Sequence, residues 1–343
     1  MLVYLDQSAL SALARESRMA GVLASLRASV EGGDVLCLRS QEHQDETLLA
    51  PREMWDAIDT LGDELATGVE FRAREEIQWN EIHAAAAKFL GIGAPHDEVW
   101  REAFWEDPQT PRDRLFTDFM GGAVRVRVRS EPADWQIAEV DHEKSKESRA
   151  LEEAYAHDRA VAGGSFDRLV EAYVRENIRW TIGLLADPHW FAAYYGRLQA
   201  DLQRDADLVN PDISPGSPFT RLQAFVNKGS QTKWLIDRFP ALRQRSEEFA
   251  TSDELRHVPS IAYPAILRAA LAALPRRRVK PGDGYDIAHL TQGLSRCDVV
   301  TADSGMAQLC RDRKLVPSGC RLLSYRELEQ LPVAIEGAAD LLS

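Results

Sequence analysis

The sequence lacks the features that would place it in a membrane or outside the cell. It has no apolar run near the ~18 residues that a membrane-spanning helix needs. It begins directly with a strand-like run at residues 2–6, where a signal peptide would carry a charged and then an apolar stretch. Its 4 cysteines have no CxxC spacing, which favours buried, reduced thiols. These absences predict a cytoplasmic protein without membrane contact.

Excess positive charge is also missing. The net charge of −13 argues against a protein that coats nucleic acid without specificity. It leaves room for an enzyme whose acidic residues concentrate at a metal site and whose basic residues are local. Arg276, Arg277, Arg278 and Lys280 form such a local cluster. We expect them to hold the phosphates of a substrate, and the alternative is a solvated loop without that role.

Both ends of the chain have the pattern of a parallel α/β fold. Strand-like runs at 2–6 and 34–39 enclose helical stretches, the first of which we expect Ser8 to cap. Such a β-α-β unit implies parallel strands. Near the other end, a helix that starts around Asp283 precedes a short buried strand at 299–300. Further elements are expected as a helix over 304–313, a strand over 320–323 and a helix over 325–331.

The middle of the chain is different, because amphipathic helical patterns dominate it. We expect helices at about 55–65, 73–90, 97–105, 147–162, 166–185, 190–208, 220–239 and 259–274, and a strand with an arginine face at 124–129. The aromatic residues of these helices are expected to pack in the core. The sequence therefore predicts an α/β fold with one parallel sheet of four or five strands flanked by helices. Residues 1–50 and 276–343 should build that sheet, with 51–275 as a large, mostly α-helical insertion.

Four acidic side chains are expected at one edge of this sheet. Asp6 and Asp303 each follow a strand, and those two strands should be adjacent and parallel. Asp286 starts a helix, and Glu46 lies in the first turns of another. Ligands of open α/β sheets bind outside the carboxyl ends of the strands. Carboxylates gathered there would repel one another without a cation, and such hard oxygen ligands suit Mg²⁺ or Mn²⁺. The alternatives are ordinary capping, turn and helix-surface positions.

These motifs together resemble the PIN-domain (PIN-like) nuclease family. The resemblance rests on residues 3–8, 38–47, 286–290 and 299–303. It implies a PIN-like sheet and a hydrolase that cleaves RNA, usually as an endoribonuclease, with Mg²⁺ or Mn²⁺. It also implies that Asp6, Glu46, Asp286 and Asp303 are the catalytic metal ligands. Many members of the family are toxins of toxin–antitoxin pairs or act in RNA processing and defence.

The long helical middle departs from the compact toxins of that family, which argues against a simple toxin role. We expect this segment to form a lid over the site and to support a homodimer. An antitoxin or another regulatory partner is the kind of protein that the resemblance implies. Among the secondary residues, we expect Asp298 to be structural and His289 to pack or to make a hydrogen bond. A direct role of Asp298 and a place for Asp283 as an additional acid near the metal are the alternatives to structural roles.

Two alternatives stay open. The run from Gly282 to Asp286 loosely resembles the Gly-Asp-Gly-x-Asn-Asp loop of HAD-type phosphatases, with Asp6 as the nucleophile. Against it, the loop is one residue short and Ser8 stands where that family has a second acid. The other alternative is a PIN-like scaffold without catalysis that binds a partner through the helical middle. The presence of all four acids argues against such a degenerate site.

Overall fold

The computed structural model describes residues 1–40, 42–43, 46, 54–93, 100–105, 125–127, 149, 151–205, 218–274, 277, 279–280 and 282–342. The chain divides into two compact units. Unit 1 comprises Met1–Glu76, Glu98–Arg149 and Arg278–Ser343, and unit 2 comprises Ile77–Asp97 and Ala150–Arg277. Within the described residues, no helix combines the length and the apolar character needed to cross a bilayer.

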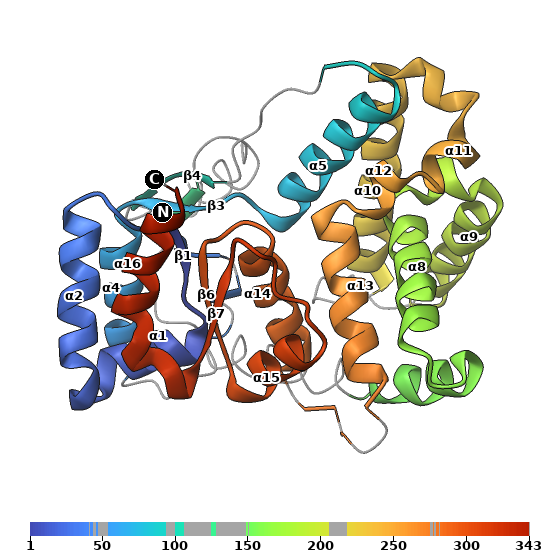
Figure 1. The fold of residues 1–343 in the computed structure, drawn as a ribbon. Helices are drawn as coiled ribbons and strands as arrows, with labels where there is room; N and C mark the ends of the chain where they lie inside the picture. The colour runs from blue at the N-terminus through green and yellow to red at the C-terminus, as the bar shows by residue number, and fades with distance from the viewer. Residues whose placement is uncertain are drawn as a thin grey trace. The chain divides into compact units, whose positions relative to one another are not determined.

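Unit 1 is built on a four-stranded parallel sheet. Its strands in spatial order are β2 (Leu36–Cys37), β1 (Leu2–Tyr4), β6 (Val299–Ala302) and β7 (Arg321–Ser324). Val3 of β1 pairs with Cys37 on one side and with Val299 on the other, so the two ends of the chain meet in the centre of the sheet (Figure 1). The predicted α/β class is confirmed, as is the parallel adjacency of the strands that lead to Asp6 and Asp303.

The chain leaves the two central strands in opposite directions. From β1 it crosses to β2 through α1 (Gln7–Arg15), η1 (Ser17–Met19) and α2 (Ala20–Glu31). From β6 it crosses to β7, on the other side, through α15 (Ser304–Asp312). This reversal between β1 and β6 is a topological switch point, and ligands of open α/β sheets bind outside the carboxyl ends of the strands at such a point.

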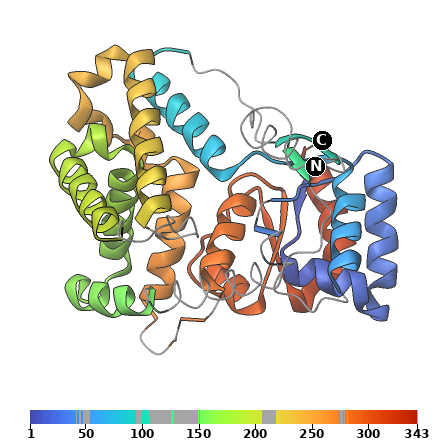
Figure 2. The same ribbon diagram turned by 180° about the vertical axis from the view of Figure 1, so that it is seen from behind.

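Helices cover both faces of the sheet, as Figures 1 and 2 show. On one side lie α2, α4 (Trp55–Ala66) and α16 (Leu331–Leu342), and on the other lie α14 (Asp283–Leu294) and α15. The 3₁₀ helix η4 (Tyr325–Gln330) connects β7 to α16. The strand alternation explains this division. Val3 and Val299 belong to the large apolar core on the first side, whereas Tyr4 and Val300 face α14.

A second sheet of three strands also belongs to unit 1. It consists of β3 (Val69–Phe71), β4 (Trp100–Trp105) and β5 (Arg125–Arg127). β4 shows that the predicted helix over 97–105 is wrong. Its sequence WREAFW is rich in aromatic residues, which favour strands, and it pairs antiparallel with β3. The strand predicted at 124–129 is confirmed by β5. The sequence had assigned α4 and β3 to the helical insertion, but both lie in unit 1.

The described residues of unit 2 form helices joined by turns and contain no strand. Residues 151–162 are helical, and they are accompanied by α5 (Arg74–Phe89), α8 (Phe166–Ala186), α9 (Pro188–Asp205), α10 (Pro218–Arg238), η3 (Pro240–Arg243), α11 (Ser246–Ala250), α12 (Asp253–Arg256) and α13 (Pro259–Ala272). α8 packs against α13, α9 and α10. Trp180, Trp190 and Phe225 form part of an aromatic cluster between α8, α9 and α10, as expected for core aromatics.

Gly293 marks a close approach of α14 to the sheet. A Cβ atom at this position would lie 2.9 Å from Val300 Cγ1 and 3.1 Å from Tyr4 Cδ1. We therefore expect Gly293→Ala to lower the free energy of unfolding by about 1–2 kcal/mol, because overpacking costs about 1–3 kcal/mol and exceeds the helix-propensity gain of about 1 kcal/mol. Urea unfolding measures this.

Gly21 of α2 provides a matched control, because a Cβ there would have no neighbour within 4 Å. Gly21→Ala should be neutral or stabilise the protein by up to about 1 kcal/mol. A Gly293→Ala protein that is as stable as Gly21→Ala would contradict the close packing of α14 on the sheet.

Candidate metal centre

Asp6 lies at the switch point, directly before α1. Its Oδ1 accepts hydrogen bonds from the Ala9 N–H at 3.1 Å and from the Thr301 hydroxyl at 2.8 Å, and its Oδ2 accepts from the Ser8 hydroxyl at 2.6 Å. Burial raises the pKa of Asp6, and the donors from Ser8 and Thr301 offset part of that rise. Because α1 begins at Gln7, the capping position falls on Asp6. The prediction that Ser8 caps this helix is therefore wrong.

Asp303 has the matching position after β6. Its Oδ1 accepts a hydrogen bond from the Met306 N–H at 2.7 Å, which caps α15. The capping role considered for Asp303 is therefore present in the structure. Asp286 lies in the first turn of α14. All three carboxylates stand at the N-terminus of a helix, where the helix dipole and free N–H groups favour negative charge.

The electrostatics of Asp286 connect the four predicted acids. Burial raises the pKa of Asp286 from 3.8 to about 8, and the charges of Asp303, Glu46 and Asp6 add to the rise, whereas His289 opposes it. An acid in this state holds its proton at neutral pH, because ionisation would place a further negative charge among the others. The structure thus brings the four predicted residues into one electrostatic cluster at the carboxyl edge of the sheet.

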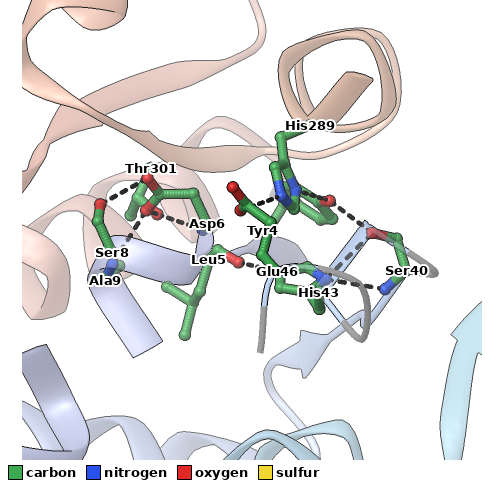
Figure 3. Close-up of polar contacts among 10 residues, drawn as sticks. All are labelled: Tyr4, Leu5, Asp6, Ser8, Ala9, Ser40, His43, Glu46, His289 and Thr301. Carbon is green, nitrogen blue, oxygen red and sulfur yellow. Dashed lines mark hydrogen bonds and ion pairs between the residues drawn. The ribbon is translucent and has the colours of Figure 1, made fainter. Parts of the chain in front are cut away.

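Glu46 joins the cluster beside His289. Its Oε2 lies 2.9 Å from His289 Nε2, and the other ring nitrogen, Nδ1, lies 2.5 Å from the Tyr4 hydroxyl (Figure 3). Burial alone would lower the pKa of His289. The hydrogen bond and charge of Glu46, with the charges of Glu42 and Asp6, outweigh burial and raise the pKa. The predicted packing or hydrogen-bonding role of His289 is confirmed.

Tyr4 extends this contact into the buried chain of hydrogen bonds that Figure 3 shows. Its hydroxyl lies 2.8 Å from Ser40 Oγ, and the Ser40 N–H donates to His43 Nδ1 at 3.0 Å. Because this nitrogen accepts, His43 carries its proton on Nε2 and donates it to the Leu5 carbonyl at 2.5 Å. Burial raises the pKa of Tyr4 well above its usual range, so the phenol stays protonated. The chain ties the segment after β2 to the backbone after β1.

Three of these polar residues lie within the motifs that carry the resemblance but were given no role from the sequence: Tyr4, Ser40 and Thr301. A signal for two of them was present. Tyr4 precedes Asp6 by two residues, and Thr301 precedes Asp303 by two residues. The two-residue period of a strand places such pairs on the same side. Polar residues two positions before a predicted strand-end acid are therefore candidates for the site, although the acid that each one supports is not fixed by this spacing: Thr301 donates to Asp6 and not to Asp303.

The remaining acids have distinct places. Glu42 is buried, and its charge contributes to the raised pKa values of Tyr4 and His289. Asp298 accepts the Leu2 N–H at 2.7 Å, at the far end of β6 from Asp303, so its predicted structural role is confirmed.

Asp283, also buried, accepts the Lys280 N–H at 2.9 Å and closes the turn before α14. This bond gives Asp283 a structural role in positioning the first turn of α14. Of the predicted basic cluster, only Arg277 and Lys280 are described. Lys280 is exposed and Arg277 is half-buried, while Arg276 and Arg278 lie outside the described residues. The substrate-binding role of all four stays a prediction.

Across the described residues, no group of three or more His, Cys, Asp or Glu side chains is placed to hold a metal ion. The carboxylates instead accept hydrogen bonds from the protein: Asp6 from Ser8 and Thr301, and Glu46 from His289. The donor set nevertheless suits a hard divalent cation, because all four side chains offer oxygen. The pKa of Asp286 is raised mainly by burial, and the charges of Asp303, Glu46 and Asp6 add to the rise. A cation among these oxygens would offset both effects.

Comparison of the chain with models of known protein families, with curated proteins and with solved structures gave no match.

The buried hydrogen-bond chain should contribute to stability. Tyr4→Phe would remove the hydroxyl that bonds Ser40 and His289. Each buried polar group that is left unpaired costs about 1–3 kcal/mol. We expect a loss of about 2 kcal/mol in the free energy of unfolding by urea. Tyr325→Phe is the control, because that half-buried phenol donates to Glu16 and accepts from Arg18, and both partners are partly exposed to solvent. Equal effects of the two variants would contradict the role of the chain.

The pKa of Asp286 makes stability depend on pH. The folded protein binds a proton that the unfolded chain releases above pH ~4, so this residue destabilises the fold progressively as pH rises toward 8. Asp286→Asn removes that dependence. Each pKa unit corresponds to about 1.4 kcal/mol, and partial exposure and relaxation reduce this value. We therefore expect the free energy of unfolding of Asp286→Asn to rise, relative to that of the wild type, by on the order of 2 kcal/mol between pH 5.5 and 8.5.

The measurement is urea unfolding in EDTA at both pH values for the wild type and for Asp286→Asn. The stability advantage of the variant should grow with pH. An advantage that is the same at pH 5.5 and at pH 8.5 would show that Asp286 is ionised throughout and that the four acids do not act on one another.

Proposed function

We propose that the protein is a PIN-like, metal-dependent endoribonuclease that hydrolyses RNA phosphodiester bonds at the switch point between β1 and β6. The observation that carries this proposal is the position of Asp286 in the field of Asp303, Glu46 and Asp6. Four carboxylates gathered at the ligand-binding edge of a parallel sheet destabilise the empty site and favour a divalent cation. Structural ion-pair networks, by contrast, place acids beside arginine or lysine.

Asp6, Glu46, Asp286 and Asp303 would hold Mg²⁺ or Mn²⁺. When bound, such an ion supplies an activated water and stabilises the charge that develops on a phosphate during in-line displacement. The chain's own residues prepare the ligands. Ser8 and Thr301 orient the two oxygens of Asp6, and His289 orients Glu46. Such outer partners fix the direction of a ligand and are as much a part of a metal site as the ligands.

Asp286 has a separate part in this scheme. With a raised pKa it keeps its proton in the empty site and loses it when positive charge arrives, so metal binding should release a proton near neutral pH. Affinity for the ion should then rise with pH until Asp286 is ionised. The predicted phosphate contacts of Arg276, Arg277, Arg278 and Lys280 would give this acidic region its local positive charge. The lid role of the helical segment, its self-association and an antitoxin partner stay proposals.

The decisive experiment removes one charge from the cluster and keeps its shape. Asp6→Asn and Asp303→Asn should fold, lose RNA cleavage by at least about 100-fold, and lose the thermal stabilisation that Mn²⁺ gives the wild type. Cleavage of a labelled RNA and thermal melts with and without Mn²⁺ measure both quantities. A folded Asp6→Asn protein that cleaves at the wild-type rate would rule out this mechanism.

Asp298→Asn is the matched control, because it removes the same charge at the opposite end of β6. This variant should keep both cleavage and the Mn²⁺ effect. A small phosphomonoester tests the phosphatase alternative, since a HAD-type enzyme should hydrolyse it and a nuclease should not. A protein that binds RNA but cleaves neither substrate with Mn²⁺ would be the non-catalytic scaffold.

A further inference from the structure

One exposed face of α10, in unit 2, carries no acidic side chain, although the protein as a whole is strongly acidic. Gln223, Asn227, Gln231, Trp234 and Arg238 are all exposed. Their spacing of 4, 4, 3 and 4 residues places them in one line along the helix. At about 1.5 Å per residue this line is roughly 22 Å long. We call these five residues the α10 stripe.

The charge of α10 also stands apart from that of the chain. The protein carries a net charge of −13, but α10 contains Arg221, Lys228, Lys233 and Arg238 and only a single acid, Asp237. That acid is neutralised by Arg243, at 3.2 Å. Lys233, exposed beside the stripe, makes no ion pair with any residue that the structure describes. The helix therefore offers local positive charge on an acidic protein, which a polyanion would meet favourably.

Trp234 is the feature that points to the kind of polyanion. It is 50% exposed, unlike the core aromatics that the sequence predicted for these helices. Its ring packs on the ring of the buried His83, with 4.2 Å between the ring centroids and 31° between the planes. This contact holds the indole in place. The Arg238 guanidinium carbon lies 5.7 Å from the centroid of the Trp234 ring. The guanidinium lies over the half-exposed ring. An indole and a guanidinium together can form a stacking platform for a base.

The other members of the stripe fit the same ligand. Amide side chains such as Gln223, Asn227 and Gln231 both donate and accept hydrogen bonds, which suits the edges of unstacked bases. The stripe contains no carboxylate. It also contains a single large apolar side chain, which is too little apolar area for the centre of a protein interface or for a membrane surface. These properties favour single-stranded nucleic acid over either of those partners.

We propose that the α10 stripe binds single-stranded RNA, with a base stacked on Trp234 and phosphates held by Lys233 and Arg238. The choice of RNA rests on the proposed nuclease function, but binding here requires neither the metal nor cleavage. Stacking on an aromatic ring is tolerant of sequence, so the stripe should hold unpaired RNA of varied sequence. It should not hold duplex RNA comparably, because paired bases are not free to stack on the indole.

The test measures the affinity of the full chain for a labelled, unstructured 15-nucleotide RNA by fluorescence anisotropy, in EDTA so that nothing is cleaved. Trp234→Ala should weaken binding about tenfold, and Trp234→Tyr, which keeps a stacking ring, should restore most of the affinity. Lys233→Gln with Arg238→Gln should lower the slope of log K against log salt by about 1.4. The double variant leaves the ring of Trp234 in contact with His83. A loss of affinity in this variant therefore reports on RNA binding and not on a loss of that packing.

Arg175→Gln is the control for charge, because Arg175 lies on α8 and is 71% exposed. It should leave affinity and salt slope unchanged. The proposal is overturned if Trp234→Ala and the double variant bind the single strand like the wild type, if Arg175→Gln weakens binding as much as they do, or if a duplex of equal length binds as tightly. Trp234-dependent binding by a protein that cleaves no RNA would instead reject the nuclease function and keep this inference.

Discussion

Repulsion among carboxylates at the carboxyl ends of β1 and β6 is the constraint on which the rest of unit 1 depends. The fold places Asp6 and Asp303 after adjacent parallel strands, and α14 adds Asp286 to the same edge. Such a cluster costs free energy in a protein whose total stability is only about 5–15 kcal/mol. Much of the surrounding structure can be understood as compensation for this cost.

The compensation has two parts. Helix N-termini receive three of the acids, and hydroxyl donors from Ser8 and Thr301 hold Asp6. Glu46 is held by His289, which the Tyr4 phenol orients in turn. These contacts orient the ligands, but the pKa of Asp286 is still raised to about 8, mainly by burial and further by the charges of Asp303, Glu46 and Asp6. The residual charge is what a cation would relieve, and it links the stability of the fold to the proposed chemistry.

The sequence predicted the parts of this arrangement that depend on local patterns. The short apolar run before Asp303 and the strand-like start before Asp6 were sufficient to place both acids at one sheet edge. The helix predicted over 97–105 was wrong because the aromatic residues of β4 favour a strand and its pairing with β3, which is not visible in the local sequence, stabilises it. The contacts of Tyr4 with His289 and Ser40 were missed for a related reason. They join residues 285 and 36 positions apart, so only the assembled sheet reveals them.

The central claim is that four carboxylates, distant in sequence, converge on one cation. Cleavage of the backbone by bound iron tests it most directly. Fe²⁺ substituted for Mg²⁺, with ascorbate and peroxide, produces hydroxyl radicals that cut the chain next to the ion. The account predicts cuts beside Asp6, Glu46, Asp286 and Asp303 together, suppressed by excess Mg²⁺ and absent in Asp6→Asn. Cuts at one of these segments only, or none that Mg²⁺ suppresses, would contradict a shared metal centre.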